Sequence, residues 1–193
     1  MPITLNGTTG VVTPGATVGS ITGILKATSG VVSQAVAGSD YGQLTLATAQ
    51  SATGTAVDFT SIPSWAKRIT VMFNGVSTDG SSPFQVQIGS GSFVTSGYDS
   101  TGTSASNSVG TITATGGFLI YLGSPTTDCS GHMIITLFGN NTWISSCTFK
   151  ATPTVTGFGA GDVTLSGTLD RLRVTTVNGT DTFDAGTINI SYE

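Results

Sequence analysis

Short runs in which apolar and polar residues alternate recur along most of this 193-residue chain, and they are its most constraining feature. The first is Ile62–Val76 (IPSWAKRITVMFNGV), where a turn containing proline leads into alternation that places Ile69, Val71 and Phe73 on one face. Successive side chains of a β-strand point to opposite faces of the sheet. The pattern therefore predicts a strand with one buried face and one mostly polar face.

Similar runs follow at spacings of about 8–12 residues, which is typical of β-sandwiches and barrels. They are Phe84–Ile88, Val109–Thr113, Gly116–Leu122, Gly131–Phe138, Trp143–Lys150, Thr154–Phe158, Val163–Leu165, Thr168–Val177 and Gly186–Tyr192. The chain has 35 Thr, 23 Ser and 27 Gly but a single Glu, a composition that suits strands and tight turns better than helices. We therefore predict an all-β fold, an antiparallel, jelly-roll-like β-sandwich over residues 46–193.

Two glycine-rich stretches are predicted to interrupt the strands. Gly89–Ser108 is rich in Gly, Ser and Thr, and it is expected to be a long loop or a frayed hairpin with Phe93 and Tyr98 as isolated aromatic residues. Gly159-Ala160-Gly161 is expected to separate two short strands. Loops of this kind carry function more often than strands do.

Residues 1–45 are predicted to form an extended N-terminal attachment arm. Short apolar pairs recur there among Gly, Thr and Ser: Val11-Val12, Ile24-Leu25 and Val31-Val32. The pairs are too few to form a core, but each is long enough to add a strand to a neighbouring subunit or to lie in a groove. We expect these six residues to anchor the arm, with a disordered N-terminus as the alternative.

The two cysteines are predicted to be reduced. An Asn140-Asn141 turn would place Ile134 opposite Cys147 in a hairpin and would leave Cys129 well out of register. Two cysteines that far apart exceed the Cα separation of about 7 Å that a disulfide allows.

The charge content excludes several classes of partner. Charged residues are 8% of the chain, and 6 Lys and Arg against 10 Asp and Glu give a net charge of −4. Nucleic-acid binding needs clustered cations, whereas here only Lys67-Arg68 are adjacent and Arg171 and Arg173 share a strand face. No apolar run reaches the roughly 18 residues that span a bilayer. We expect neither a nucleic-acid partner nor membrane insertion.

Catalytic and metal-binding patterns are also weak. The only histidine, His132, begins an alternating run and is expected to be a strand-end residue rather than a catalytic base. Asp170, Asp181 and Asp184 are expected in or beside turns, with a surface cation site and a glycosidase carboxylate pair as alternatives. No residues have zinc-ligand spacing. We therefore expect a protein that is not an enzyme and has no cofactor or bound metal.

Four residues are candidates for contact with a surface ligand: Trp65, Lys67, Phe93 and Tyr98. Aromatic side chains can stack on sugars, and a place in the core or at an interface is the alternative. The predicted loops Ser77–Pro83 and Gly89–Ser108 are the corresponding contact regions.

Several longer stretches resemble proteins of tailed bacteriophages. Residues 62–82 (IPSWAKRITVMFNGVSTDGSS) and 167–193 (GTLDRLRVTTVNGTDTFDAGTINISYE) resemble the C-terminal module of tail-fibre and related virion proteins. Residues 3–15 (ITLNGTTGVVTPG) and 23–42 (GILKATSGVVSQAVAGSDYG) resemble the N-terminal portions of such fibres. There an arm commonly ends in Ala-Gly-(Thr/Ser)-Asp-Tyr, which matches Ala37-Gly38-Ser39-Asp40-Tyr41.

The resemblance implies a virion structural protein that is made in the bacterial cytoplasm. It would be a homotrimer whose arm binds other virion proteins and whose β-domain faces outward. We expect a short tail fibre or appendage that contacts a host-surface glycan or protein. Because the chain has no long shaft of the kind most tail fibres have, a capsid decoration protein (cement or head fibre) is the alternative. A glycan-degrading enzyme and a free lectin module are further alternatives.

Overall fold

The computed structural model describes residues 23–29, 31–36, 40–106, 108–120, 125–151 and 154–193. Strands make up 62% of the described residues, all in antiparallel sheets, and no described residue is helical. The predicted all-β sandwich class is therefore confirmed. The chain divides into two compact units, Met1–Tyr41 and Gly42–Glu193.

The described part of the first unit is a β-hairpin. Strands β1 (Leu25–Thr28) and β2 (Val31–Gln34) pair antiparallel, with Leu25 opposite Gln34. The carboxylate of Asp40 accepts hydrogen bonds from the Val36 N–H (2.7 Å) and from Lys26 Nζ (2.9 Å). Leu25, Val31 and Val32 thus belong to one small sheet, and Ile24 directly precedes it, whereas Val11 and Val12 lie outside the described residues.

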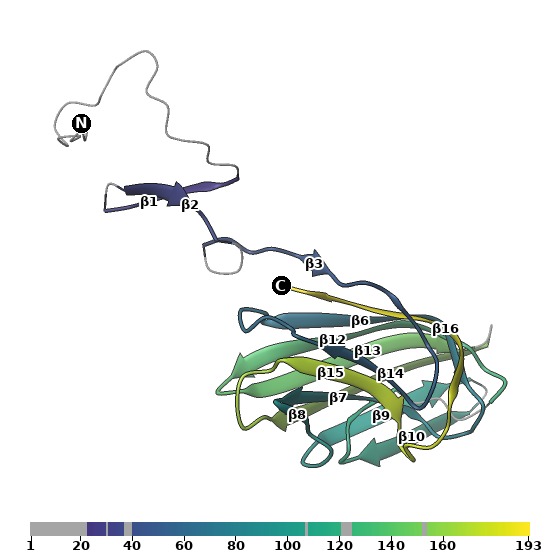
Figure 1. The fold of residues 1–193 in the computed structure, drawn as a ribbon. Helices are drawn as coiled ribbons and strands as arrows, with labels where there is room; N and C mark the ends of the chain where they lie inside the picture. The colour runs from purple at the N-terminus through teal and green to yellow at the C-terminus, as the bar shows by residue number, and fades with distance from the viewer. Residues whose placement is uncertain (1–22, 30, 37–39, 107, 121–124, 152–153) are drawn as a thin grey trace, which may run out of the picture. The chain divides into compact units, whose positions relative to one another are not determined.

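The second unit contains two sheets, drawn as separate layers in Figure 1. In the large sheet the order is β10-β9-β14-β13-β12-β6-β16-β3, and β4 also pairs with β16. Its strands are β3 (Thr45–Leu46), β4 (Gln50–Ser51), β6 (Arg68–Thr78), β9 (Asp99–Ala105), β10 (Val109–Ala114), β12 (Cys129–Gly139), β13 (Thr142–Ala151), β14 (Val155–Thr164) and β16 (Phe183–Tyr192).

The small sheet has the order β11-β7-β15-β5, and β8 pairs with β7. Its strands are β5 (Ala56–Thr60), β7 (Phe84–Ser90), β8 (Ser92–Phe93), β11 (Phe118–Ile120) and β15 (Arg171–Thr176). Buried side chains from the inner faces of both sheets form one apolar core.

Strand β6 is central to that core. It lies between β12 and β16, so both of its edges are hydrogen-bonded. Ile69 and Val71 are fully buried and Phe73 nearly so, as their alternation predicted. Each such side chain contributes roughly 1.5–3 kcal/mol through removal of apolar surface from water.

Residues 62–82 and 167–193, far apart in the sequence, lie side by side in space. Strand β6 from the first block pairs with β16 from the second. The loops beyond them are also joined: the Asp79 carboxylate accepts hydrogen bonds from the N–H and the hydroxyl of Thr182 (both 2.7 Å), and Asp181 accepts one from the Ser82 N–H (2.9 Å).

Strand β9 corrects the expectation that Gly89–Ser108 is a long loop or a frayed hairpin. The segment Asp99–Ala105 pairs with β10 on one side and with β14 on the other. Its Ser, Thr and Gly residues give no apolar alternation, so the sequence pattern does not reveal a strand. Inside the sandwich, Ser100 is buried, and its Oγ accepts a hydrogen bond from the Leu119 N–H (2.9 Å).

Strand β14 corrects the expected break at Gly159-Ala160-Gly161, because it runs without interruption from Val155 to Thr164. A Cβ at position 161 would lie 2.5 Å from the Asp99 carbonyl oxygen. A Cβ at position 159 would lie 2.9 Å from the Thr101 carbonyl oxygen. These glycines therefore permit the close approach of β9 to β14 instead of ending the strand.

The β12–β13 hairpin has the predicted Asn140-Asn141 turn, and both residues have positive φ. The predicted register is wrong by one residue, because Met133 and not Ile134 pairs with Cys147. An irregularity between Leu137 and Gly139 adds one residue to β12 and shifts all pairs beyond it, as a β-bulge does.

The substitution Gly161→Ala is expected to lower the free energy of unfolding by about 1–3 kcal/mol, because its methyl group collides with backbone atoms of β9. Gly42→Ala is the matched control, since a Cβ there meets nothing within 4 Å. Urea denaturation measures both variants. An equal effect of the two substitutions would contradict the steric account of Gly161.

Candidate functional site

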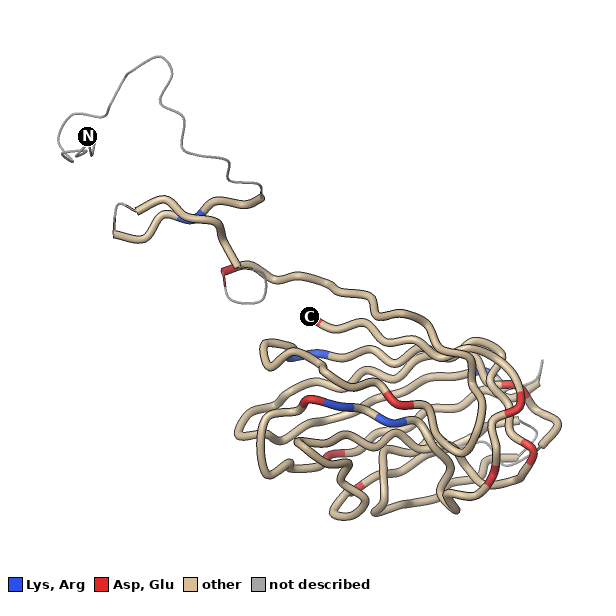
Figure 2. The backbone as a smooth tube through the Cα atoms, viewed as in Figure 1, with Lys and Arg blue, Asp and Glu red and all other residues tan. Residues whose placement is uncertain are grey.

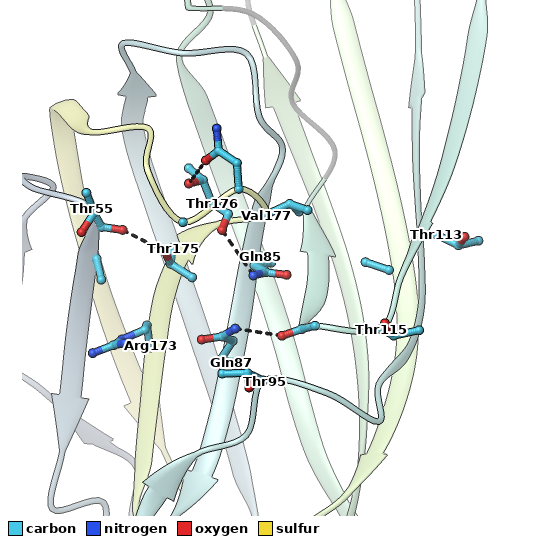
Figure 3. A pocket seen from close by; sticks show the side chains of 15 residues that line it. Thr55, Gln85, Gln87, Thr95, Thr113, Thr115, Arg173, Thr175, Thr176 and Val177 are labelled. Carbon is cyan, nitrogen blue, oxygen red and sulfur yellow. Dashed lines mark hydrogen bonds between the residues drawn. The ribbon is translucent and has the colours of Figure 1, made fainter.

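The outer face of the small sheet carries a polar cleft of about 540 Å³ (Figure 3). We call it the small-sheet cleft. It is lined by Thr55, Ala56, Gln85, Gln87, Thr95, Thr113, Ala114, Thr115, Gly116, Arg173, Thr175, Thr176, Val177, Asn178 and Gly179. This volume is within the range of pockets that bind small organic ligands, roughly 300–1,000 Å³.

The alternation of β7 builds the floor of this cleft. Phe84, Val86 and Ile88 point into the core, so Gln85 and Gln87 point to the outer face. Both glutamines are nevertheless buried, with exposed fractions of 5% and 6%. A polar side chain on an outer sheet face is usually solvated, so their burial marks a face that is covered in part by other segments.

Hydrogen bonds hold the two glutamine amides in place. Gln87 Nε2 donates to the Gly116 carbonyl oxygen (2.9 Å), and Gln85 Nε2 donates to the Thr176 carbonyl oxygen (3.3 Å). The Gln85 Oε1 atom is buried and has no hydrogen-bond partner among the residues that the structure describes. A buried acceptor without a partner costs roughly 1–3 kcal/mol.

Hydroxyl groups line the walls. Thr175 Oγ1 donates to the Thr55 carbonyl oxygen (2.8 Å) on the β5 side. On the opposite wall and at the lower edge in Figure 3, Thr95, Thr113 and Thr115 are exposed, and their hydroxyls form no hydrogen bond with other described residues. The cleft therefore presents side-chain donors and acceptors that are available to a ligand.

Arg173 contributes little net charge to the cleft. It forms two hydrogen bonds to the Asp58 carboxylate (2.7 and 2.8 Å), and this pairing raises the pKa of Arg173 above its ordinary value. Its guanidinium carbon also lies 4.2 Å from the centre of the Phe93 ring. Arg171, paired with Asp170, lies 5.8 Å from the same ring. We call Phe93, Arg171 and Arg173 the arginine–phenylalanine patch.

The sequence candidates Trp65 and Lys67 lie where β6 begins. Trp65 is half-buried against the core, and its ring centre is 5.5 Å from that of Tyr192. Lys67 is exposed, and its Nζ donates to the Ser64 carbonyl oxygen (3.2 Å). Among the described residues, no hydrogen bond or ring contact joins this pair to Phe93 or Tyr98.

The candidates Phe93 and Tyr98 have different surroundings. Phe93 is half-buried in the arginine–phenylalanine patch. Tyr98 is only 2% exposed, which corrects the expectation that it contacts a surface ligand. Its hydroxyl accepts a hydrogen bond from the Ile88 N–H (2.8 Å), and its ring packs edge-on against Phe118. Burial raises the pKa of Tyr98 to about 12.

The remaining titratable candidates are dispersed. Both cysteines are free, as expected, and both are buried. Burial raises the pKa of the Cys129 thiol to about 12 and that of Cys147 to about 11. His132 is exposed within β12. In the part of the chain that the structure describes, no three His, Cys, Asp or Glu residues form a metal-binding group, and no helix is long and apolar enough to cross a bilayer.

Asp170, Asp181 and Asp184 each bond to groups of the protein. Asp170 accepts hydrogen bonds from Arg171 and from the Gly91 N–H. Asp181 bonds to the Asn178 side chain, and Asp184 bonds to the Ser77 hydroxyl. Asp170 and Asp181 therefore stabilise loops, whereas Asp184 lies in β16 and joins it to Ser77 of β6.

Comparisons with known proteins found no match: no protein-family model, no curated protein and no solved structure is similar to this chain. The class that the geometry defines is an all-β sandwich with a polar cleft on its smaller sheet. None of the sequence candidates lines this cleft. The sequence feature that could have indicated the cleft is the pair Gln85 and Gln87, which alternate with apolar residues in β7.

Acid is expected to weaken the loop contacts. Hydrogen bonds from Thr182 hold the pKa of Asp79 below its usual range, and hydrogen bonds from Arg171 do the same for Asp170. A lowered pKa in the folded state stabilises the protein above the unfolded-state value, about 3.9, and this stabilisation is lost as pH falls through the folded-state value. Asp79→Asn should therefore flatten the loss of stability between about pH 5 and pH 2.

Urea denaturation at several pH values measures that slope. Thr182→Val removes one of the two donors to Asp79 and should give an intermediate slope. If Asp79→Asn has the slope of the unsubstituted protein, Asp79 makes no contribution to acid sensitivity.

Proposed function

We propose that this protein is a non-enzymatic structural component of a tailed-bacteriophage virion, a short tail fibre or appendage. In this proposal the first unit attaches the protein to other virion proteins, and the sandwich contacts the host surface. The observation that carries the proposal is the exposed apolar surface of the β1–β2 hairpin.

The hairpin exposes large apolar side chains that a self-sufficient domain would bury. Their exposed fractions are 55% for Ile24, 50% for Leu25, 66% for Val31, 45% for Val32 and 57% for Val36. A two-stranded hairpin by itself is marginally stable in water. Covering this surface with a partner would contribute roughly 25 cal/mol per Å² of apolar area. The hairpin is therefore suited to gain its stability at an attachment site.

The resemblance of residues 62–82 and 167–193 to virion proteins supports the same proposal. Because β6 and β16 pair and the adjoining loops are hydrogen-bonded, the two blocks constitute one contiguous part of the sandwich. A resemblance shared by contiguous segments is what a common structural module would produce.

A homotrimer is part of the proposal, and the edge strand β10 supports it. Its sequence, VGTITA, has no charged residue and no proline, and Val109 is 72% exposed. Edge strands without such protection tend to pair with another chain. Figure 2 shows how sparsely charged residues occur along the sandwich strands.

Val31→Asp is expected to reduce incorporation into virions strongly, because it places a charge on the surface that the attachment site would cover. Ile144→Asp is the matched control: it introduces the same charge at an exposed, β-branched apolar residue of the sandwich, in β13 and away from the β10 edge, and should leave attachment largely intact. Immunoblotting of purified particles measures incorporation. Equal incorporation of the Val31→Asp variant and the unsubstituted protein would overturn the anchoring role.

The position of the protein on the particle, seen by cryo-electron microscopy, decides between an appendage and the decoration alternative. A tail position supports the proposal, whereas a regular array on the head would replace it with a capsid decoration role. Absence from the particle would overturn both.

Light scattering of the purified full chain should give three times the 19.4 kDa chain mass. A mass of one chain at micromolar concentration would contradict the trimer, since the β10 edge would then have no partner strand from another chain.

A further inference from the structure

We propose that the small-sheet cleft binds a neutral saccharide through hydrogen bonds from its amide and hydroxyl side chains. The inference rests on the host-contact part of the proposed function and names its ligand class. It locates the contact on the outer face of β7 and β15 instead of at Trp65 and Lys67.

The chemistry of the lining favours a ligand rich in hydroxyl groups. Glutamine, asparagine and threonine side chains each offer both donors and acceptors, as sugar hydroxyls do. Apolar lining is limited to the small side chains of Ala56, Ala114 and Val177. A peptide or lipid ligand would lack a pocket for a large apolar group. A polyhydroxylated ring matches the walls without one.

The charges on this face favour a neutral ligand. Among the described residues that line the cleft, Arg173 is the only charged one, and both of its hydrogen bonds go to Asp58. An anionic sugar would have to compete with that bidentate pair, whose guanidinium plane also lies against Phe93. Arg173 therefore shapes one end of the cleft and adds no free positive charge.

The Phe93 ring does not provide an open stacking platform. One face of the ring is occupied by Arg173 at 4.2 Å. Binding must therefore depend on polar contacts, which are strongest where the groups are held in position before the ligand arrives. The hydrogen bonds from Gln87 to Gly116 and from Thr175 to Thr55 hold these two side chains in fixed positions.

The second observation that points to a ligand is the unsatisfied oxygen of Gln85. The exposed fraction of Gln85 is 5%, and its Oε1 atom has no hydrogen-bond partner within the described part of the chain. The atom lies against Gly117, where an added Cβ would come within 2.9 Å of it. Rotation of the Gln85 amide toward the cleft would let a ligand hydroxyl supply the missing donor. Gln87 adds a second acceptor, since its Oε1 points toward Arg173 across the cleft (Figure 3).

The test uses the purified full chain and defined saccharides. Neutral di- and trisaccharides of hexoses and N-acetylhexosamines form one arm, and uronate- and sialate-containing oligosaccharides form the other. Glycan-array screening followed by titration of the strongest neutral binder should give saturable binding. No neutral binder at millimolar concentration, or binding of the acidic set alone, would overturn the inference.

Three variants locate the site with the neutral binder from that screen. Thr115→Val removes an exposed wall hydroxyl and should weaken binding by about 2–10-fold, the loss of one hydrogen bond. Ala56→Phe fills the cleft and should abolish binding. Thr148→Val makes the same chemical change at an exposed position of the large sheet and should leave binding unchanged.

Thermal unfolding of each variant shows whether it is folded. If Ala56→Phe does not fold, Thr115→Val alone still tests the assignment. If the affinity is unchanged by both Thr115→Val and Ala56→Phe, the assignment of the binding site to this cleft is overturned. The result of this binding test can be distinguished from a failure of the proposed virion function. A virion component that binds no neutral saccharide refutes only the cleft, and saccharide binding by a protein absent from particles refutes only the virion role.

Discussion

The pairing of β6 with β16 is the constraint on which the rest of the sandwich depends. The inner face of β6 supplies fully buried core residues, and β6 can be buried on both edges only if β16 closes the side opposite β12. The same pairing brings together the loops that Asp79, Asp181 and Thr182 join. The backbone of Glu193 extends the contact by bonding to Lys67 and Arg68. Packing of the small sheet, and with it the placement of β7 and β15, presupposes this closed layer.

The cleft is a product of that packing. Strand β7 must point Phe84, Val86 and Ile88 inward, and the period of a strand then forces Gln85 and Gln87 outward. Segments that connect the sheets cover these glutamines in part, so polar groups that would be solvated on an open face become fixed acceptors and donors. The exposed surfaces of the two units differ in polarity: the first unit exposes apolar side chains, and the cleft of the second unit exposes polar ones.

The sequence predicted the strands whose partners lie in the core. Alternation identified β6, β7, β13, β15 and β16, because burial of one face leaves a period of two. It could not identify β9, whose Ser, Thr and Gly residues are fixed by neighbours on both sides, nor the continuity of β14 through Gly159 and Gly161. Tyr98 was misplaced because an isolated aromatic residue has no pattern to show which way it points. The cleft escaped prediction because its lining comes from segments far apart in sequence that only the fold brings together.

The long sequence separation between β6 and β16 also affects the order in which the two strands are synthesised. Ser77 and Asp184, which bond across the end of this pair, are 107 residues apart in the chain. At translation rates of about 5–20 residues per second, β6 leaves the ribosome on the order of 5 to 20 seconds before its partner. During that interval one edge of β6 remains open, next to side chains that the folded protein removes entirely from water. Nascent chains on the same messenger RNA are the nearest source of a competing strand.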